Sequence, residues 1–236
     1  MHAIVFAAVV MFIQQPASAA PQPPMLIVGG DARILAVPDE ATVRLGIVRQ
    51  APSAQAVQEQ ANTAAQEILS AVQKTGVPAN QIQTARLVLT PVYAPRSPDS
   101  RDAPRIVAYN ATNTISVRLD NLSIIGAVID AGLKAGANQI EGVGFSLRND
   151  LPSRQQALKQ AVEEARAKAQ VMADAARVNL GEVIEISEGG VNVVPRFEPA
   201  FAGRAMAASA PETPVSPGQI EVRASVTIRY RVSPKP

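Results

Sequence analysis

The chain has 236 residues, of which 47% are hydrophobic and 18% charged, a balance typical of a folded domain. Its formal net charge is only +2, and no run of basic residues carries interleaved aromatic side chains, so we expect no nucleic-acid partner. The chain contains no cysteine, which excludes disulfides, Cys-zinc sites, CxxC redox pairs and thiol nucleophiles.

Residues 1–19 differ from the rest of the chain. Residues 3–13 form an apolar run of about the length of a signal-peptide core, which is too short to span a bilayer. Ala17-Ser18-Ala19 follows with small residues at the spacing that signal peptidase accepts, and we expect cleavage after Ala19 and export of residues 20–236 as a single domain. Met1-His2 lacks the Lys or Arg that usually precedes such a core. The alternative interpretation of the apolar run is a buried N-terminal strand.

Two strands are predicted after the signal peptide. Residues 25–33 form an apolar run with two glycines, which indicates a strand with a bulge or a close backbone approach. Residues 41–49 alternate between apolar and polar side chains, as a half-exposed strand does. Because the intervening Val37-Pro38-Asp39-Glu40 is typical of a turn, we expect the two strands to form a hairpin.

Two amphipathic helices are predicted in the middle of the chain from apolar residues at three- and four-residue spacing. The first runs from Ser53 to about Thr75 and ends at Gly76. The second and shorter one covers residues 122–133 and ends at Gly136.

The longest helical pattern spans residues 152–180 and is predicted to be the structural spine of the fold. Ser153 is a candidate N-cap after Pro152, and Asn179-Leu180-Gly181 tolerates the left-handed conformation of a C-cap. The predicted buried face consists of Ala157, Leu158, Ala161, Val162, Ala165, Ala169, Met172, Ala173 and Ala176. Since most of these side chains are alanine, the helix backbone can approach a neighbouring element closely.

Alternating apolar residues predict five further strands, at residues 82–93, 105–119, 140–147, 182–188 and 219–232. Two segments rich in proline lack helical and strand periodicity, and we expect them to be flexible loops: residues 94–104 and 191–217. The predicted fold class is therefore α+β, with a mixed or antiparallel sheet, two long helices and one shorter helix.

A short internal similarity suggests a duplication. Residues 74–82 (KTGVPANQI) resemble residues 134–140 (KAGANQI), and in both a helix ends at glycine and a strand begins at isoleucine. Similar helix stops also arise by chance, so the absence of a true repeat is the alternative. A real repeat would give two related βα units on one mixed sheet.

The side chains that usually carry catalysis are scarce. The only histidine is His2, inside the predicted signal peptide, so the mature chain would lack the imidazole of Ser-His-Asp triads and of most zinc and copper sites. Gly142-Val143-Gly144 begins like a dinucleotide-binding motif but continues as a strand without the third glycine. We expect no catalytic, cofactor-binding or metal-binding residues, no cofactor and no enzymatic activity.

Two-carboxylate hydrolysis is the one enzymatic class that the composition leaves open. The candidate acids are Asp39, Glu40, Asp120, Asp150, Glu163 and Glu164. Lysine and arginine lie within helical reach of Glu163 and Glu164, which favours solvated ion pairs there. Asp39 follows a proline, where its carboxylate can accept backbone N–H groups.

Six short motifs in order resemble the SIMPL-domain family, which includes the YggE proteins and the periplasmic immunogenic protein. They are residues 38–41 (PDEA), Thr84 with 89–93 (LTPVY), 109–113 (YNATN), 138–145, the alanine-rich helix, and 180–183 (LGEV) with 186–188 (ISE). The resemblance covers residues 25–232. It implies an exported α+β protein associated with oxidative-stress tolerance, with one member similar to a channel-like ring and no established catalytic residues.

These observations predict a periplasmic protein that acts by binding or by self-assembly. We expect a homo-oligomer, with a possible channel-like form and outer-membrane or envelope association. The alternative is a carboxylate-dependent hydrolase, or a binding module, for envelope glycans, in which Asp39 or Glu40 lies near residues 191–217 as a lid.

Overall fold

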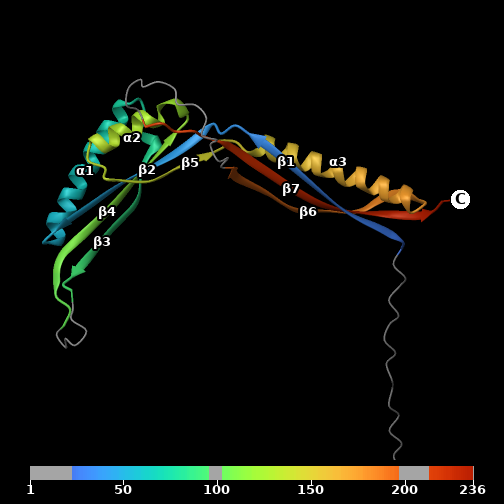
Figure 1. Cartoon of the computed structure of the whole chain (residues 1–236), viewed down its shortest axis with the longest axis horizontal. Helices are drawn as coiled ribbons and strands as arrows, with labels where there is room; N and C mark the ends of the chain where they lie inside the picture. The colour runs from blue at the N-terminus through green and yellow to red at the C-terminus, as the bar shows by residue number, and fades with distance from the viewer. Residues whose placement is uncertain (1–22, 96–102, 197–212, 236) are drawn as a thin grey trace, which may run out of the picture.

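The computed structural model describes residues 23–95, 103–196 and 213–235. These residues form two antiparallel sheets that lie end to end, as Figure 1 shows, and three α-helices cover one side of them. In Figure 1 the two sheets meet at an angle, with the helices on the convex side of the arch and open sheet faces on the other side. The predicted α+β fold class is confirmed, although the strands form two sheets and not one mixed sheet.

The four-stranded lobe has the strand order β3-β4-β2-β5. Its strands are β2 (Glu40–Ala51), β3 (Ile82–Tyr93), β4 (Ile106–Leu119) and β5 (Gln139–Ser146), and its helices are α1 (Ala54–Lys74) and α2 (Ile125–Lys134). Single 3-10 turns at Ala79–Gln81 and Leu122–Ile124 precede β3 and α2. The chain order β-α-β-β-α-β with all neighbours antiparallel is the split βαβ arrangement of ferredoxin-like folds.

The two halves of this lobe occupy equivalent places, as the predicted duplication requires. α1 leads to the edge strand β3, and α2 leads to the opposite edge strand β5. Gly76 and Gly136 end the helices with φ of 95° and 108°, a left-handed conformation that favours glycine. The residues directly after them, Val77 and Ala137, are both buried in the same core. This correspondence supports two related βα units on one sheet.

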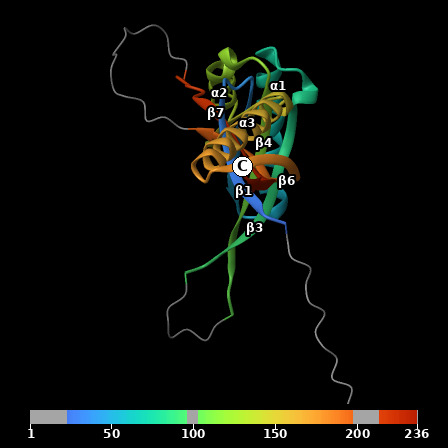
Figure 2. The ribbon, with the colours of Figure 1, turned by 90° about the vertical axis from the view of Figure 1, so that its right-hand side faces the viewer.

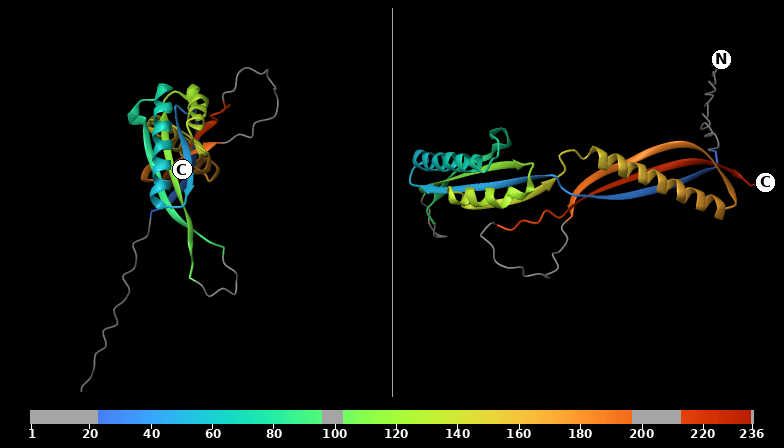
Figure 3. Two further views of the ribbon diagram at one scale, coloured as in Figure 1. Left: turned by 90° about the vertical axis from the view of Figure 1, so that its left-hand side faces the viewer. Right: turned by 90° about the horizontal axis from the view of Figure 1, so that it is seen from above.

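The three-stranded lobe is built from both ends of the described chain. Its strand order is β1-β7-β6, with β1 at Met25–Ala36, β7 at Gln219–Pro234 and β6 at Val178–Arg196. β7 is the central strand and is antiparallel to both neighbours. The helix α3 (Leu151–Ala175) packs on this sheet, on the same side of the molecule as α1 and α2 (Figures 2 and 3).

A ladder of alanines joins α3 to its sheet. The fully buried residues of the helix recur at every fourth position: Ala157, Ala161, Ala165, Ala169 and Ala173. They pack on the even-numbered apolar side chains of β7 between Ile220 and Tyr230. On β1 the helix meets Gly30, where a Cβ atom would overlap the carbonyl oxygen of Ala161 and lie 2.7 Å from the Cβ of Ala165. The helix backbone therefore rests almost directly on the strand.

Three features tie the two lobes together. β1 continues into β2 through residues 37–39, and Phe145 at the end of β5 packs against the cores of both lobes. The segment before β7 also reaches back to the four-stranded lobe, where Val215 packs against its core and the Thr213 hydroxyl donates to Asp130 of α2 at 2.8 Å.

The predicted hairpin of residues 25–49 is wrong, because β1 pairs with β7 while β2 pairs with β4 and β5. A residue before proline is restricted to extended conformations, so Val37-Pro38 prolongs the path of the chain and does not reverse it. Pro38 is buried at the lobe junction, whereas Val37 is 74% exposed. The turn-like composition marks a crossing between sheets.

The predicted loop at residues 191–217 is also partly wrong. β6 continues through Val191–Arg196, and Pro195 pairs with Ile220 of β7. A proline is tolerated there because β6 is an edge strand, where a missing N–H donor leaves no neighbour unpaired. Residues 197–212 and the tip of the predicted loop at 94–104 lie outside the described residues.

The ends of the long helix differ from the prediction. α3 begins at Leu151, so Ser153 lies inside the first turn, and the N-cap position is held by Asp150 without a side-chain capping bond. The left-handed residue after the helix is Arg177, with φ of 56°, and Asn179-Leu180 already belongs to β6. Met172, predicted to be buried, is 47% exposed because the buried stripe is narrower than the sequence pattern.

The contact of α3 with β1 predicts that Gly30→Ala destabilises the fold. The added methyl group would force the helix away from the strand, and we expect the free energy of unfolding to fall by about 1 to 3 kcal/mol. Urea unfolding followed by circular dichroism measures the change. Gly29→Ala is the matched control, because its Cβ would come no closer than 3.9 Å to Val226 O. Equal losses in both variants would contradict the close-packing explanation.

Candidate functional site

The candidate acids at the lobe junction act as ties between loops. Asp39 accepts a bond from the backbone N–H of Arg148 at 2.7 Å, and Asp120 forms an ion pair with the Arg148 guanidinium at 3.0 Å. Glu40 accepts from the Ser146 hydroxyl at 3.0 Å. These contacts fix the chain where it leaves β5 for α3.

The remaining candidate acids lie on α3 or at its start. Asp150 pairs with Arg154 at 2.7 Å, one helical turn away, and Glu163 is exposed. Glu164 pairs with Lys168 at 2.9 Å and accepts a bond from the backbone N–H of Asp31. That backbone bond, followed by Lys168, holds the pKa of Glu164 below its usual value. Glu164 thereby attaches the helix to β1.

The structure thus brings Asp39, Glu40 and Asp120 to one junction, while Asp150, Glu163 and Glu164 lie elsewhere. Five of the six acids are held by an arginine, a lysine, a hydroxyl or a backbone N–H group. In the described ranges, no three His, Cys, Asp or Glu side chains come together as metal ligands would. These contacts are those of structural ion pairs and turn bonds.

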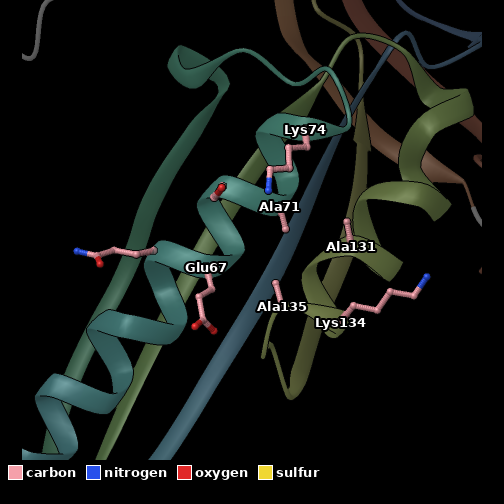
Figure 4. A pocket seen from close by; sticks show the side chains of 8 residues that line it. Glu67, Ala71, Lys74, Ala131, Lys134 and Ala135 are labelled. Atoms are coloured by element: carbon pink, nitrogen blue, oxygen red, sulfur yellow. The ribbon is translucent and has the colours of Figure 1, made fainter.

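A shallow groove of about 630 Å³ runs between α1 and α2 (Figure 4). Its floor is formed by Ala71, Ala131 and Ala135, and the equivalent lysines Lys74 and Lys134 stand at the last turns of the two helices. Figure 4 shows the Lys134 side chain pointing away from α1. Cations at helix C-termini interact favourably with the helix dipole, which accounts for both lysines without a ligand.

The open face of the three-stranded sheet is polar and carries a hollow of about 400 Å³. Its lining residues are Asp31, Ala32, Arg33, Gly190, Asn192, Arg223, Ala224 and Ser225. The strand register places Arg33, Arg223 and Asn192 side by side in one row across β1, β7 and β6. Unlike the helix groove, this hollow has two arginines that are direct register partners, Arg33 and Arg223, beside small side chains.

Glu221 lies one row away from these arginines and is the buried charge of the open face. The residue is only 5% exposed, and its carboxylate accepts a bond from Arg223 Nε at 2.6 Å and pairs with Arg33 Nε at 3.5 Å. The bond from Arg223 is the main cause that lowers the pKa of Glu221, and the charges of Arg33 and Arg196 act in the same direction. Glu221 thus remains ionised and orients both guanidinium groups.

The sequence did not reveal this cluster. Alternation in β7 correctly assigns Glu221 and Arg223 to the face opposite Ile220 and Val222, but it does not show that Arg33 is the register partner of Arg223. The pairing of β1 with β7 is a contact between the two ends of the chain. The available signal was the row of three arginines, Arg223, Arg229 and Arg231, that follows Glu221 at odd-numbered positions of β7.

Within the described residues, none of the helices combines the length and the hydropathy that crossing a bilayer requires.

The low pKa of Glu221 predicts a pH-dependent contribution to stability. A carboxyl group whose pKa is lower in the folded state stabilises the fold above its unfolded pKa of about 4.3, and this contribution is lost as pH falls through the folded value. Glu221→Gln should therefore be less stable than wild type at pH 7, with the gap closing below about pH 4.

Urea unfolding at several pH values checks this expectation. Glu185→Gln is the control, because Glu185 pairs with Arg229 on the same face but is half exposed, and we expect a smaller loss. A gap for Glu221→Gln that stays constant from pH 3 to pH 7 would argue against an ionised, buried Glu221.

Comparison with known proteins agrees with the resemblance noted in the sequence. The chain matches the family SIMPL, described as a protein of unknown function (DUF541), over residues 26–230. The 26 kDa periplasmic immunogenic protein of Brucella melitensis is 34% identical over 218 residues, which cover 89% of this chain and 86% of that protein. The uncharacterized protein YggE of Escherichia coli K12 is 28% identical over 207 residues, which cover 87% and 80%. The name of the Brucella relative supports a periplasmic location, and the chain belongs to the SIMPL family.

Proposed function

We propose that this SIMPL protein is exported to the periplasm and acts there by assembling with copies of itself, in a role that supports envelope integrity under oxidative stress. The observation that carries the proposal is the pair of long edge strands in the three-stranded lobe. In the described part of the chain, β1 and β6 each pair on one side only, with β7. Edge strands present unpaired N–H and C=O groups that another chain can use.

Both edge strands also expose large apolar side chains. On β1, Ile27 is 50% and Leu35 is 48% exposed, and on β6 the most exposed are Ile186 at 59% and Val183 at 46%. An isolated exposed apolar residue is ordinary, but apolar residues along an open strand edge favour pairing with a second chain. The three-stranded sheet therefore exposes apolar side chains at both of its edges.

The geometry of the edges favours a head-to-tail contact. Both β1 and β6 are antiparallel to β7, so they run parallel to each other at opposite edges of the sheet. A second copy placed beside the first would bring its β1 parallel to this β6. Such heterologous contacts form closed rings when the rotation between copies closes.

The regular part of the β6 edge is its last segment. Register shifts lie between Leu180 and Gly190, and bulges of this kind weaken pairing at an edge. Val191–Arg196 pairs without interruption, and Val194 there is 41% exposed. We therefore place the contact between this segment and the edge of β1 near Leu35.

The assembly predicts a native mass of several chains for the mature protein, measured by size-exclusion chromatography with light scattering. Leu35→Glu and Val194→Glu should each lower that mass, because a buried unpaired charge in the contact opposes association. Leu133→Glu is the control, since Leu133 is 40% exposed on α2, in the other lobe. A strict monomer at high wild-type concentration removes the proposal.

Export predicts that the protein recovered from the periplasmic fraction begins at Ala20. Amino-terminal sequencing of that fraction tests cleavage after Ala19, which follows the small-residue motif at residues 17–19. Protein that still carries Met1 and His2, or that stays in the cytoplasmic fraction, would contradict export. A fraction bound to outer membranes would extend the proposal to envelope association.

A further inference from the structure

We propose that the hollow on the open face of the three-stranded sheet binds a small polar carboxylate, held by Arg33 and Arg223. The hollow opens on the face of the sheet and shares Asn192 with the β6 segment on which the assembly rests, but the inference does not depend on that proposal. It rests on the shape of the hollow, the pairing of its two arginines and the balance of charges around them.

The shape of the hollow follows from small side chains in the middle of the sheet. Asp31, Ser225 and Gly190 form one row across β1, β7 and β6, and Gly29, Thr227 and Ser187 form the next. Arg33 and Arg223 stand at one end of these rows, directly beside Asp31 and Ser225. The result is a depression in an otherwise flat surface, with room for a molecule the size of a monosaccharide.

The two arginines are direct cross-strand partners, which is unfavourable for like charges unless an anion lies between them. The carboxylate of Glu221 offsets only part of the repulsion between the two guanidinium groups. Its Oε1 atom contacts Nε of Arg223 at 2.6 Å and Nε of Arg33 at 3.5 Å, so a single carboxylate serves two guanidinium groups. Arg33 nevertheless remains 72% exposed and Arg223 52% exposed, both at the rim of the hollow.

This arrangement resembles a prepared anion site. Glu221 holds each guanidinium from the Nε side, and the planar fork of arginine is suited to bidentate recognition of a carboxylate. Since Glu221 is 5% exposed, it orients the arginines from beneath and leaves the surface above them accessible. Glu221 is thus a positioning residue, and Arg33 and Arg223 are the residues that would touch the ligand.

The rest of the lining indicates what accompanies the carboxylate. The charges of Arg33 and Arg223 are balanced by those of Glu221 and Asp31, so the two exposed guanidinium groups, and not a net positive charge, would attract the carboxylate. A second negative charge on the ligand would have no partner here, which favours a singly charged anion. Asp31 can accept bonds from ligand hydroxyl or amino groups, and Asn192 and Ser225 can donate or accept. The ligand class is therefore a carboxylate with neighbouring hydroxyl or amino groups, such as a uronic acid.

Isothermal titration calorimetry on the mature protein tests the site, with sodium glucuronate as the probe and glucose and inorganic sulfate as comparisons. We expect glucuronate to bind and glucose to show no binding, with sulfate weaker than glucuronate. Arg33→Gln and Arg223→Gln should each weaken glucuronate binding by about tenfold or more, since a lost hydrogen bond to a charged group has at least that effect. Circular dichroism and thermal unfolding verify that the variants remain folded.

Arg229→Gln is the matched control, because Arg229 lies on the same face of β7, pairs with Glu185 at 2.7 Å and lies outside the hollow. It should leave glucuronate affinity unchanged. The proposal is overturned if glucuronate does not bind, if sulfate binds as tightly as glucuronate, or if Arg33→Gln and Arg223→Gln bind glucuronate as Arg229→Gln does. A monomeric protein that still binds glucuronate would refute the assembly and leave the site intact.

Discussion

The close approach of α3 to β1 is the constraint on which the three-stranded lobe depends. Alanine at every fourth helix position and Gly30 on the strand let two backbones pack with almost no side chain between them. Because the helix packs so closely on one face of the sheet, the even-numbered apolar side chains of β7 are buried there. The opposite face is left to arginines and acids, which form the polar surface where the hollow lies.

The two lobes are stabilised in different ways. The four-stranded lobe has a conventional core, in which branched side chains of β2 and β4 meet the apolar faces of α1 and α2. The three-stranded lobe has a thinner core, and ion pairs such as Arg229 with Glu185 and Arg231 with Glu182 cross its open face. Exposed ion pairs add little stability, so this lobe depends mainly on the helix contact.

Local signals in the sequence predicted most elements but not how they pair. Gly76 and Gly136 marked helix ends reliably, because a left-handed turn there requires glycine. Val37-Pro38 was misread as a reversal, since turn residues also occur in extended crossings. Glu221 was assigned to the correct face, yet one of its two arginine partners, Arg33, is distant in the chain. Apart from the exposed Glu163, the acids singled out by composition form ties at the lobe junction or ion pairs on α3. The arginine pair depends on strand register alone.

The position of β7 at the centre of its sheet has a consequence for the order of folding. This strand lies at the end of the chain and is the only described strand that pairs with either β1 or β6. A chain that emerges with its amino end first can complete the lobe of β2 to β5 while β1 still lacks a partner. β1 would therefore remain unpaired until β7 has emerged, and the three-stranded sheet would form only after that.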